Sequence, residues 1–494
     1  MGPCRRYDEV DEDWSGPVDV GPKFVFCDQY GACLKILQAQ GRCIIHFCPL
    51  QIYSNSRYIH DNSLLQCSEV KGGEFIAEND RMSQLPHDVL MTIMSLLTMK
   101  EAGKTSIVSH TWYNLWRCLP VLFFKVDPYS TIKDKLLLPE QRSGFTGWVN
   151  SVVGAHLGPV IDELRVIFDL DVRLESDIDK WVIFGFSKQV KHLELDLTPF
   201  YNRSISLIDC YTWPLDCRIS SLALLGNMTF LRSLCLKYVN VSGKDVECLL
   251  RVCYALEDLC IVNGSIDWTH INLPDLSLQL KHLKVLDCPR LMSIDIKVPK
   301  LVSFTHHWRP IDLHIRDSLL LSKVSIGNGE FQGEIVNHVL NSLSTCFSNV
   351  KFMSWDFMLD HPFVDNLVKV NMGINNPPCM TNLKHMEFHV TSKGNESLLG
   401  WADFIEASPF LEKLTMKFSI LYNMNTEFRR DIVKHKGRPL KSLKTLEHIG
   451  ILGLPIDIEF ATYVVENSIM LKDIGDYLPF IAEAIVRRRS RSQG

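Results

Sequence analysis

A six-residue pattern, L-x-x-L-x-L with other apolar residues in some of the leucine positions, recurs through the middle of this 494-residue chain. Its copies begin at Val190, Ile219, Leu231, Leu256, Leu280, Leu291, Leu321, Val350, Leu367, Leu383 and Leu411. Strict alternation of apolar residues is typical of a short strand with one buried face. A strand that returns at such steps indicates coils stacked on one another, because each coil can bury its apolar face only against its neighbours.

The step from Leu231 to Leu256 is 25 residues and the step from Leu256 to Leu280 is 24. Leucine-rich repeats have a period of about 20–29 residues, so this pattern is typical of them. The apolar residues of each strand would point into the core and the residues between them would line the concave face. We therefore predict an α/β solenoid with an irregular leucine-rich-repeat array over residues 190–420, preceded by a linker and first irregular repeats over residues 127–189.

One segment between two of these strands, NVSGKDVECLLRVCYAL, has the features of a helix on the outer side of a coil. Ser242 is a plausible N-cap, and Asp245 stands three residues later, as in a capping box. The residues expected on the buried side of this helix are Val246, Leu249, Leu250 and Cys253.

Residues 80–126 have a different character and predict three short helices. Pro86 stands where a first helical turn tolerates proline, because its missing N–H would be unpaired there anyway. Apolar residues then recur at steps of three and four residues, both after Pro86 and around Trp112. A unit of this size has a very small core, so this much apolar surface suggests that a partner covers part of it.

Within that segment, LPHDVLMTIMSLL followed by VSHTWYNLW closely resembles the F-box, the helical module that docks on a Skp1-type adaptor. The sequence departs from the plant pattern at Thr98-Met99, where a proline is usual, and at His110-Thr111, where a basic pair is usual. The resemblance implies a Skp1-type partner and, through it, a cullin. The residues implied in partner binding are Leu85, Pro86, Val89, Leu90, Ile93, Leu96, Leu97, Val108, Trp112 and Trp116. The sequence does not divide them between the partner and the helices' own core.

Residues 421–486 are expected to form an α+β C-terminal cap. The stretch from Leu443 to Ile474 resembles the FBD region of many plant F-box proteins and predicts a strand, a helix and a closing strand. The basic tail, residues 487–494, is typical of a solvated end, with a nuclear import signal or a nucleic-acid contact as alternatives. We expect the protein in the nucleus, the cytoplasm or both.

Residues 1–79 form an N-terminal extension to which we assign no function. Its apolar part, PKFVFCDQYGACLKILQAQGRCIIHFCPLQIY, has no clean period. It is compatible with a strand–helix–strand segment or with disorder. The first residues are polar and acidic, so we do not expect a signal peptide.

No motif in the chain predicts catalytic, cofactor-binding or metal-ligating residues. Gly103-Lys104-Thr105 lacks the earlier glycine of a phosphate-binding loop, and His306-His307 lacks a companion ligand at metal-binding spacing. The net charge of -5 and the lack of a membrane-length apolar run suggest neither a nucleic-acid partner nor a membrane. Cysteines such as Cys235, Cys260 and Cys288 lie in apolar strings and are expected to be small buried residues.

The F-box resemblance implies a substrate-recognition adaptor of an SCF (Skp1–cullin–F-box) ubiquitin ligase, which is not itself an enzyme. The repeats would bind a protein substrate that the sequence does not identify. Two alternatives stay open: a family member without a function, and a repeat scaffold or small-molecule (hormone) sensor outside a ligase. The candidate residues for such a sensor are Lys237, Tyr238, His306, Trp308 and Arg309.

Overall fold

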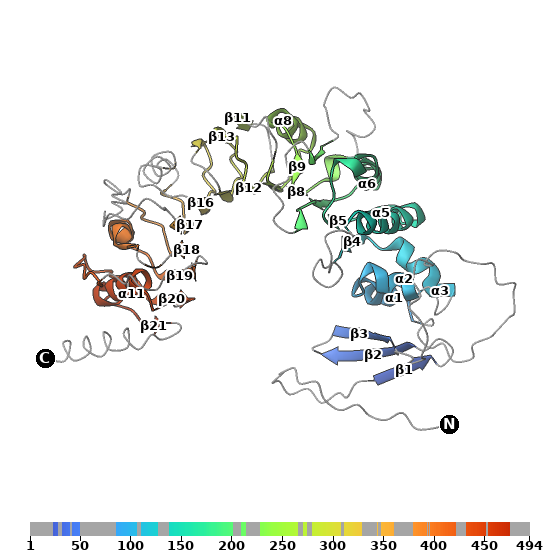
Figure 1. Ribbon diagram of the computed structural model, residues 1–494, viewed down its shortest axis with the longest axis horizontal. Helices are drawn as coiled ribbons and strands as arrows, with labels where there is room; N and C mark the ends of the chain where they lie inside the picture. Colours follow the sequence, from blue (N-terminus) through green and yellow to red (C-terminus); the bar gives the residue numbers. More distant parts are fainter. Residues whose placement is uncertain are drawn as a thin grey trace. The chain divides into compact units, whose positions relative to one another are not determined.

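The computed structural model is a mixed α/β protein, and Figure 1 traces its elements in chain order. Residues 1–122 and 155–159 make up one compact unit, and residues 123–154 and 160–494 make up a second. The structure describes residues 23–27, 32–39, 42–49, 85–105, 110–126, 138–200, 209–213, 228–264, 270–273, 279–307, 311–328, 343, 347–359, 379–392, 394, 396–420, 431–450 and 453–474.

The first unit begins with a three-stranded antiparallel sheet. Its strands are β1 (Lys23–Cys27), β2 (Ala32–Ala39) and β3 (Arg42–Pro49). A helix in this segment, one of the two alternatives that the sequence left open, is therefore wrong. Ala39 pairs with Arg42, so two residues separate β2 from β3, and the second is Gly41. A two-residue connection with glycine is the usual sequence of a β-hairpin, and it favours two strands over a strand and a helix.

The three helices predicted between residues 80 and 126 are present. They are α1 (His87–Ser95), α2 (Met99–Thr105) and α3 (His110–Leu115), and a 3-10 turn, η1 (Trp116–Cys118), follows α3. Thr98 caps α2, because its backbone N–H and its hydroxyl both donate to the Glu101 carboxylate and its hydroxyl accepts from the Glu101 N–H. The residue that replaces the usual proline thus supplies a capping box.

Among the described residues of the second unit, strands from β5 onward form a long parallel sheet with β4 at its edge. Its order follows the sequence and includes β4 (Val121–Lys125), β5 (Glu163–Ile167), β6 (His192–Asp196), β8 (Ser233–Lys237), β10 (Asp258–Val262), β12 (His282–Leu286), β14 (Ser303–His307), β16 (Lys323–Asn328), β17 (Phe352–Leu359), β18 (His385–Ser392), β19 (Lys413–Ile420), β20 (Thr445–Ile449) and β21 (Asp473–Ile474).

The helices of the second unit lie in the segments between these strands (Figure 1). They are α5 (Leu138–Ala155), whose last residue belongs to the first unit, α6 (Glu175–Ser187), α8 (Gly243–Val252), α10 (Ala402–Glu406) and α11 (Pro455–Asn467), with 3-10 turns η3 (Val172–Leu174), η6 (Met228–Phe230) and η7 (Leu399–Trp401). Short strands β7 (Tyr211–Thr212) and β9 (Val239–Asn240) pair with each other.

Side chains along each sheet strand alternate between two environments. In β8, Leu234 and Leu236 are buried, whereas Ser233, Cys235 and Lys237 are only half-buried. The same alternation recurs in β6, β10, β12, β14 and β18. The sheet therefore has a core side, which carries the repeat leucines, and an opposite side, which we call the open face.

The strands predicted at Val190, Leu231, Leu256, Leu280, Leu321, Val350, Leu383 and Leu411 are confirmed as β6, β8, β10, β12, β16, β17, β18 and β19. Those predicted at Ile219 and Leu367 lie outside the described residues. The strand at Leu291 forms, but it belongs to a second parallel sheet of β11 (His270–Leu273), β13 (Ser293–Lys297) and β15 (Asp312–Arg316).

The number of residues between successive strands of the long sheet accounts for β13 and β15. Strands β12, β14 and β16 begin at residues 282, 303 and 323, so these coils are 21 and then 20 residues long. A strand advances about 3.3 Å per residue, whereas a helix advances about 1.5 Å. A short coil can therefore return along its far side only in an extended conformation.

The turns that follow three successive sheet strands share one backbone conformation. Tyr238, Asn263 and Asp287 each have a positive φ, between 52° and 56°. Each also donates its N–H to the carbonyl of the last residue in the following sheet strand. This bond extends the ladder by one step, and the left-handed residue then turns the chain back toward the core, where Val239 and Cys288 are buried.

The predicted outer helix is α8, and its cap is confirmed. The Ser242 hydroxyl accepts the Asp245 N–H at 3.2 Å, and the Asp245 carboxylate accepts the Ser242 N–H at 2.8 Å. The residues expected on its inner side, Val246, Leu249, Leu250 and Cys253, are all buried.

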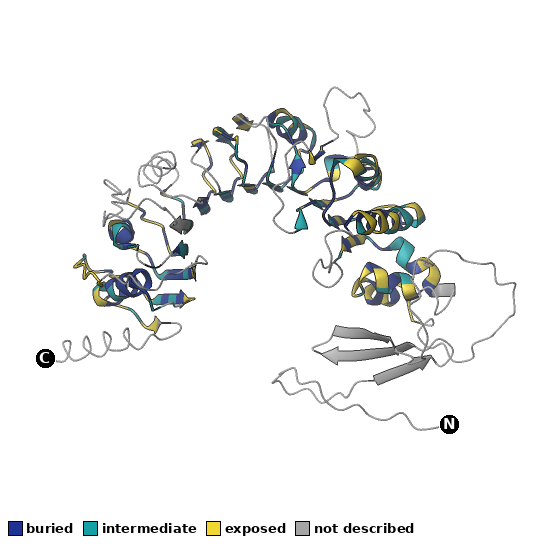
Figure 2. Ribbon diagram, in the orientation of Figure 1, coloured by how far each residue is buried: buried dark blue, intermediate teal, exposed yellow. Residues whose placement is uncertain are grey.

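The predicted order at the C-terminal end, a strand, a helix and a closing strand, is confirmed as β20, α11 and β21. Figure 2 shows α11 almost entirely buried, whereas α5 has a broad exposed side. Glu459 of α11 is 1% exposed, and its carboxylate accepts the Ser397 hydroxyl at 2.7 Å and the Val433 N–H at 2.6 Å. The segment before β20 thus helps to cover the last helix.

No helix within the described ranges is long and apolar enough to cross a membrane. The same part of the chain holds no cluster of three or more His, Cys, Asp or Glu residues that could bind a metal ion.

Candidate functional site

One side of α1 presents apolar residues to solvent. Leu85, Val89 and Leu96 are 37%, 39% and 54% exposed, and Pro86 is exposed beside them. Val89 and Leu96 are seven residues apart, which places them on the same side of a helix. Exposed aliphatic residues gathered on so small a unit are typical of a docking surface. We call Leu85, Pro86, Val89 and Leu96 the α1 face.

The other candidates of the first unit have different environments. Leu90, Ile93 and Trp112 are buried with Met94, Met99, Ala102 and Leu115, so they hold the three helices together. Leu97 and Trp116 are half-buried, and Val108 lies outside the described residues. The structure therefore separates an apolar stripe that looked uniform in the sequence into a core and a surface.

The open face of the sheet is the second candidate surface. Pairing across the strands aligns its central residues in one row, which runs through Arg165, Glu194, Cys235, Cys260, Lys284, Thr305, Ser325, Ser354, Glu387, Thr415 and Glu447. Charged side chains gather toward both ends of this row, and small uncharged ones lie in its middle. Such a surface offers a partner hydrogen bonds and ion pairs at its ends around a flatter centre.

Near the C-terminal end of the open face, Glu387 contacts both His389 and Lys417. Its carboxylate lies 2.6 Å from His389 Nε2 and also accepts from Lys417 Nζ, which is 3.4 Å from the same imidazole nitrogen. Burial alone would raise the pKa of Glu387, but the hydrogen bonds from Lys417 and His389 outweigh burial and lower it. Glu387 is therefore ionised at neutral pH.

Near the other end, Lys237 Nζ lies 3.1 Å from Glu194 and 2.8 Å from Asp196. Burial tends to lower the pKa of Lys237, but the two carboxylates outweigh burial and raise it. The cation therefore stays charged while half-buried.

In the middle, the His307 imidazole lies over Gly327, where a Cβ atom would come within 2.7 Å of the ring. Its Nδ1 is 4.0 Å from the Asp356 carboxylate. Burial lowers the pKa of His307, and burial also raises the pKa of nearby Asp287. A neutral imidazole at neutral pH is the expected form here.

Those residues considered for a small-molecule sensor that the structure describes lie in different environments. Lys237 lies on the open face, whereas His306 is buried on the core side, where its Nδ1 is 3.1 Å from the Val285 carbonyl. Tyr238 follows β8 in the left-handed turn, and Trp308 and Arg309 lie outside the described residues.

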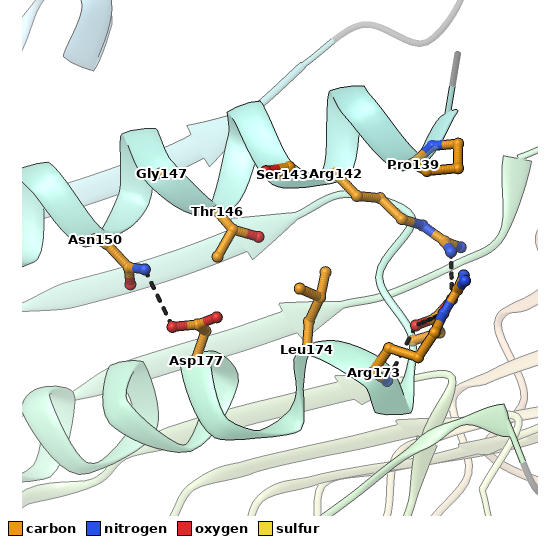
Figure 3. Close-up of a pocket in the computed structure, with 10 residues that line it drawn as sticks. Pro139, Arg142, Ser143, Thr146, Gly147, Asn150, Arg173, Leu174 and Asp177 are labelled. Atoms are coloured by element: carbon orange, nitrogen blue, oxygen red, sulfur yellow. Dashed lines mark hydrogen bonds and ion pairs between the residues drawn. The ribbon is translucent and has the colours of Figure 1, made fainter. Parts of the chain in front are cut away.

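A polar cleft of about 420 Å³ lies between α5 and the η3–α6 segment (Figure 3). Asn150 anchors its far end, where its Nδ2 donates to Asp177 at 3.1 Å and its Oδ1 accepts the Trp181 N–H at 2.7 Å. The buried Thr146 hydroxyl, on the same side of α5, has no hydrogen-bond partner among the described residues. These contacts hold α5 against α6.

At the other end of the cleft, Arg142 (Figure 3) is buried. It pairs with both Asp169 and Asp171. Burial alone would raise the pKa of Asp171, but hydrogen bonds from Arg173 and the charge of Arg142 outweigh burial and lower it. The Arg142 guanidinium thus neutralises the buried Asp169 carboxylate and shares Asp171 with Arg173.

The prediction that Cys235 and Cys260 are buried is wrong, although it is confirmed for Cys288. Both are half-exposed free thiols on the open face. They occupy the third residue of β8 and of β10, between the leucine positions, and this place in the L-x-x-L-x-L pattern was the signal that could have revealed them.

Comparison with known families identifies an F-box domain and a leucine-rich-repeat domain in this chain. Residues 82–124 match the F-box domain, and residues 164–475, more than half of the chain, match the family described as the At1g61320/AtMIF1 LRR domain.

Individual relatives extend this likeness over most of the chain. It is similar to two Arabidopsis thaliana FBD-associated F-box proteins, each 25% identical: At5g22720 over 81% of this chain and 88% of the relative, and At5g60610 over 80% and 98%. An Arabidopsis F-box/FBD/LRR-repeat protein, At4g00160, is 30% identical over 42% of this chain and 46% of its own length. The chain therefore belongs to the plant F-box/leucine-rich-repeat proteins of the FBD-containing family.

Proposed function

We propose that this protein is the substrate-recognition subunit of an SCF ubiquitin ligase. In this proposal the α1 face docks on a Skp1-type adaptor, which connects it to a cullin, and the open face of the sheet binds a protein substrate. The observation that carries the proposal is the exposure of Leu85, Val89 and Leu96 on a unit whose core already buries Leu90, Ile93 and Trp112. Clustered apolar anchors of this kind are the usual centre of a protein interface.

The repeat region would act as the recognition arm. We propose that its coils stack as an α/β solenoid and that the β20–α11–β21 segment closes the last coil. The regular row of open-face residues supports this role. Side chains at fixed spacing on a stiff sheet can contact a partner without a loss of backbone conformational entropy.

The protein itself would contribute proximity and no chemical step. Holding a substrate lysine beside a charged conjugating enzyme raises the effective concentration of the two reacting groups. We further propose that this assembly works in the nucleus, the cytoplasm or both, which imaging of a fluorescent fusion in plant cells can test.

The test is retention of a plant Skp1-type protein by the full chain. Wild type should retain it, and a Val89→Asp/Leu96→Asp double variant should lose at least about tenfold in affinity, the loss expected from about 1.4 kcal/mol. Each change places a charge in an interface that the proposal makes apolar. The matched control is His87→Glu, because His87 is exposed on α1 two residues before Val89 and so lies on the opposite side of the helix.

Two results would overturn the docking proposal. One is a wild-type chain that retains no Skp1-type protein. The other is a folded double variant that binds as tightly as wild type. The same double variant also tests the recognition arm: in affinity capture from plant cells it should keep its substrates and lose the cullin. A Glu387→Lys/Lys417→Glu exchange on the open face should keep the cullin and lose the substrates. It preserves the ion pair between the two positions but reverses the charge at each of them.

A further inference from the structure

Two cysteines stand side by side on the open face. Cys235 of β8 and Cys260 of β10 are direct register partners, and each is a free, half-exposed thiol. Each side chain shifts the pKa of the other. Because they occupy equivalent positions of neighbouring parallel strands, both thiols leave the sheet on the same side.

The spacing of the two backbones suits a covalent link. Neighbouring strands lie about 4.7–4.9 Å apart, and the Cα atoms of a disulfide lie about 4.4–6.8 Å apart. The strands therefore hold the two cysteines within bridging distance before any oxidation.

The neighbours of the pair make the two thiols unequal. Along the central row, Glu194 is the partner of Cys235 on one side, and Lys284 is the partner of Cys260 on the other. The hydrogen bond from Cys235, together with the charges of Lys284 and Lys237, lowers the pKa of Cys260 despite its burial. That same hydrogen bond, burial and the nearby Glu194 raise the pKa of Cys235. Cys260 is therefore the more readily ionised thiol of the pair, and Cys235 keeps its proton more firmly.

We propose that Cys235 and Cys260 form an oxidative modification site, a dithiol that a hydroperoxide converts into a reversible disulfide on the open face of the sheet.

The reaction has two steps. The Cys260 thiolate attacks one peroxide oxygen, so an S–O bond forms and the O–O bond breaks. The leaving alkoxide, or hydroxide if the oxidant is hydrogen peroxide, takes a proton from solvent and departs as an alcohol or as water. Cys235 then attacks the sulfenic sulfur of Cys260. An S–S bond forms, the S–O bond breaks, and the hydroxide departs as water with the Cys235 proton. Two thiols are oxidised by two electrons, and one peroxide is reduced.

The product would alter the surface on which it forms. It replaces two ionisable thiols with an uncharged bridge between Glu194 and Lys284. An exposed disulfide between neighbouring strands is open to thiol attack, so cellular reductants can reverse it. We expect this change to weaken substrate binding, and that expectation rests on the proposed function. The oxidation of the two thiols does not depend on the proposed function.

The direct test is treatment of the dilute full chain with hydrogen peroxide, alkylation, digestion without reductant and mass mapping. A peptide pair joined through Cys235 and Cys260, two hydrogens lighter than the reduced pair, should form and disappear on reduction. Cys248, which is already disulfide-bonded, serves as the reference bridge. Exposed Cys379 is the single-thiol reference for the rate of oxidation, and buried Cys288, whose pKa burial raises to about 12, should stay unmodified.

Single variants test the division of roles. Cys235→Ser should leave a sulfenic acid on Cys260 that a dimedone probe traps, because no second thiol is present to resolve it. Lys284→Glu should slow the oxidation severalfold without changing its product, because it removes a cation beside the thiolate. Cys260→Ser should leave Cys235 unreactive.

A folded wild-type chain in which Cys235 and Cys260 oxidise separately, or no faster than Cys379, would overturn the proposal. Measuring whether the oxidised chain retains a Skp1-type protein tests the adaptor function independently of the dithiol site. A disulfide that forms in a chain unable to retain a Skp1-type protein supports the dithiol site and contradicts only the adaptor function.

Discussion

Leu90 and Leu96 lie six residues apart at α1 and have opposite environments: Leu90 is 2% exposed in the three-helix core, and Leu96, at the C-cap, is 54% exposed. The same residue type therefore serves folding at one position and is available for docking at the other.

This difference predicts different results for the two substitutions. Leu90→Ala should destabilise the three-helix unit by about 2–5 kcal/mol, because it removes buried contacts and leaves a cavity. Leu96→Ala should leave the unfolding transition within about 0.5 kcal/mol of wild type, since its side chain is in solvent, and should weaken only adaptor binding. Chemical denaturation and a binding titration on both variants check this. If both variants lost the same unfolding free energy, the assignment of Leu90 to the core and Leu96 to the surface would be contradicted.

The buried Arg142 predicts a large effect in the second unit. Arg142→Met should cost about 3–5 kcal/mol of unfolding free energy, because it leaves Asp169, which is fully buried, without its counter-ion. The matched control is Arg173→Met, whose side chain is 68% exposed, pairs with Asp171 and should cost about 0–1 kcal/mol. Urea denaturation followed by tryptophan fluorescence measures both. Similar costs would mean that Asp169 is adequately solvated without Arg142.

Asp171 predicts a pH dependence. Its pKa in the folded chain is below its ordinary value of 3.8, so the folded state prefers the carboxylate more than the unfolded state does. Its stabilising contribution is present above that ordinary value and is lost as the pH falls through the lowered pKa. Urea denaturation of wild type and Asp171→Asn should therefore show a stability difference that shrinks below pH 3.8. A difference that does not change with pH would contradict the shift.

Thr146 predicts a stabilising substitution. Its buried hydroxyl has no hydrogen-bond partner among the described residues, so Thr146→Val should raise the unfolding free energy by about 1 kcal/mol. The control is Thr105→Val, because the buried Thr105 hydroxyl donates to the Ala102 carbonyl at 2.6 Å and its loss should destabilise by about 1 kcal/mol. Thermal unfolding distinguishes the two signs. A destabilised Thr146→Val would show that the hydroxyl is paired in solution.

Much of the sheet could be predicted because alternation in the sequence reflects directly which side of a strand is buried. Strands β14 and β20 depart from the six-residue pattern for a chemical reason: His306 and His448 occupy the last apolar position, and both are buried there. Strand β20 was expected only from the FBD resemblance. Strand β5 was not among the predicted strands, although Ile161, Leu164 and Val166 fit the six-residue pattern.

The docking surface could not be derived in the same way. A helix of so small a unit can be apolar nearly all round, and only the packing of α2 and α3 decides which residues it covers. The placement of Leu291 in a second sheet likewise depends on the length of its coil and not on the six residues of its motif.

The separation of core side from open face has a consequence for how such proteins diverge. A substitution at a buried strand leucine is penalised in every copy, since it creates a cavity. A substitution between those leucines changes the exposed row at a typical cost within about 0.5 kcal/mol. Gene copies that share this fold can therefore acquire new partners by drift and selection on one side of the sheet, while purifying selection keeps the other side unchanged.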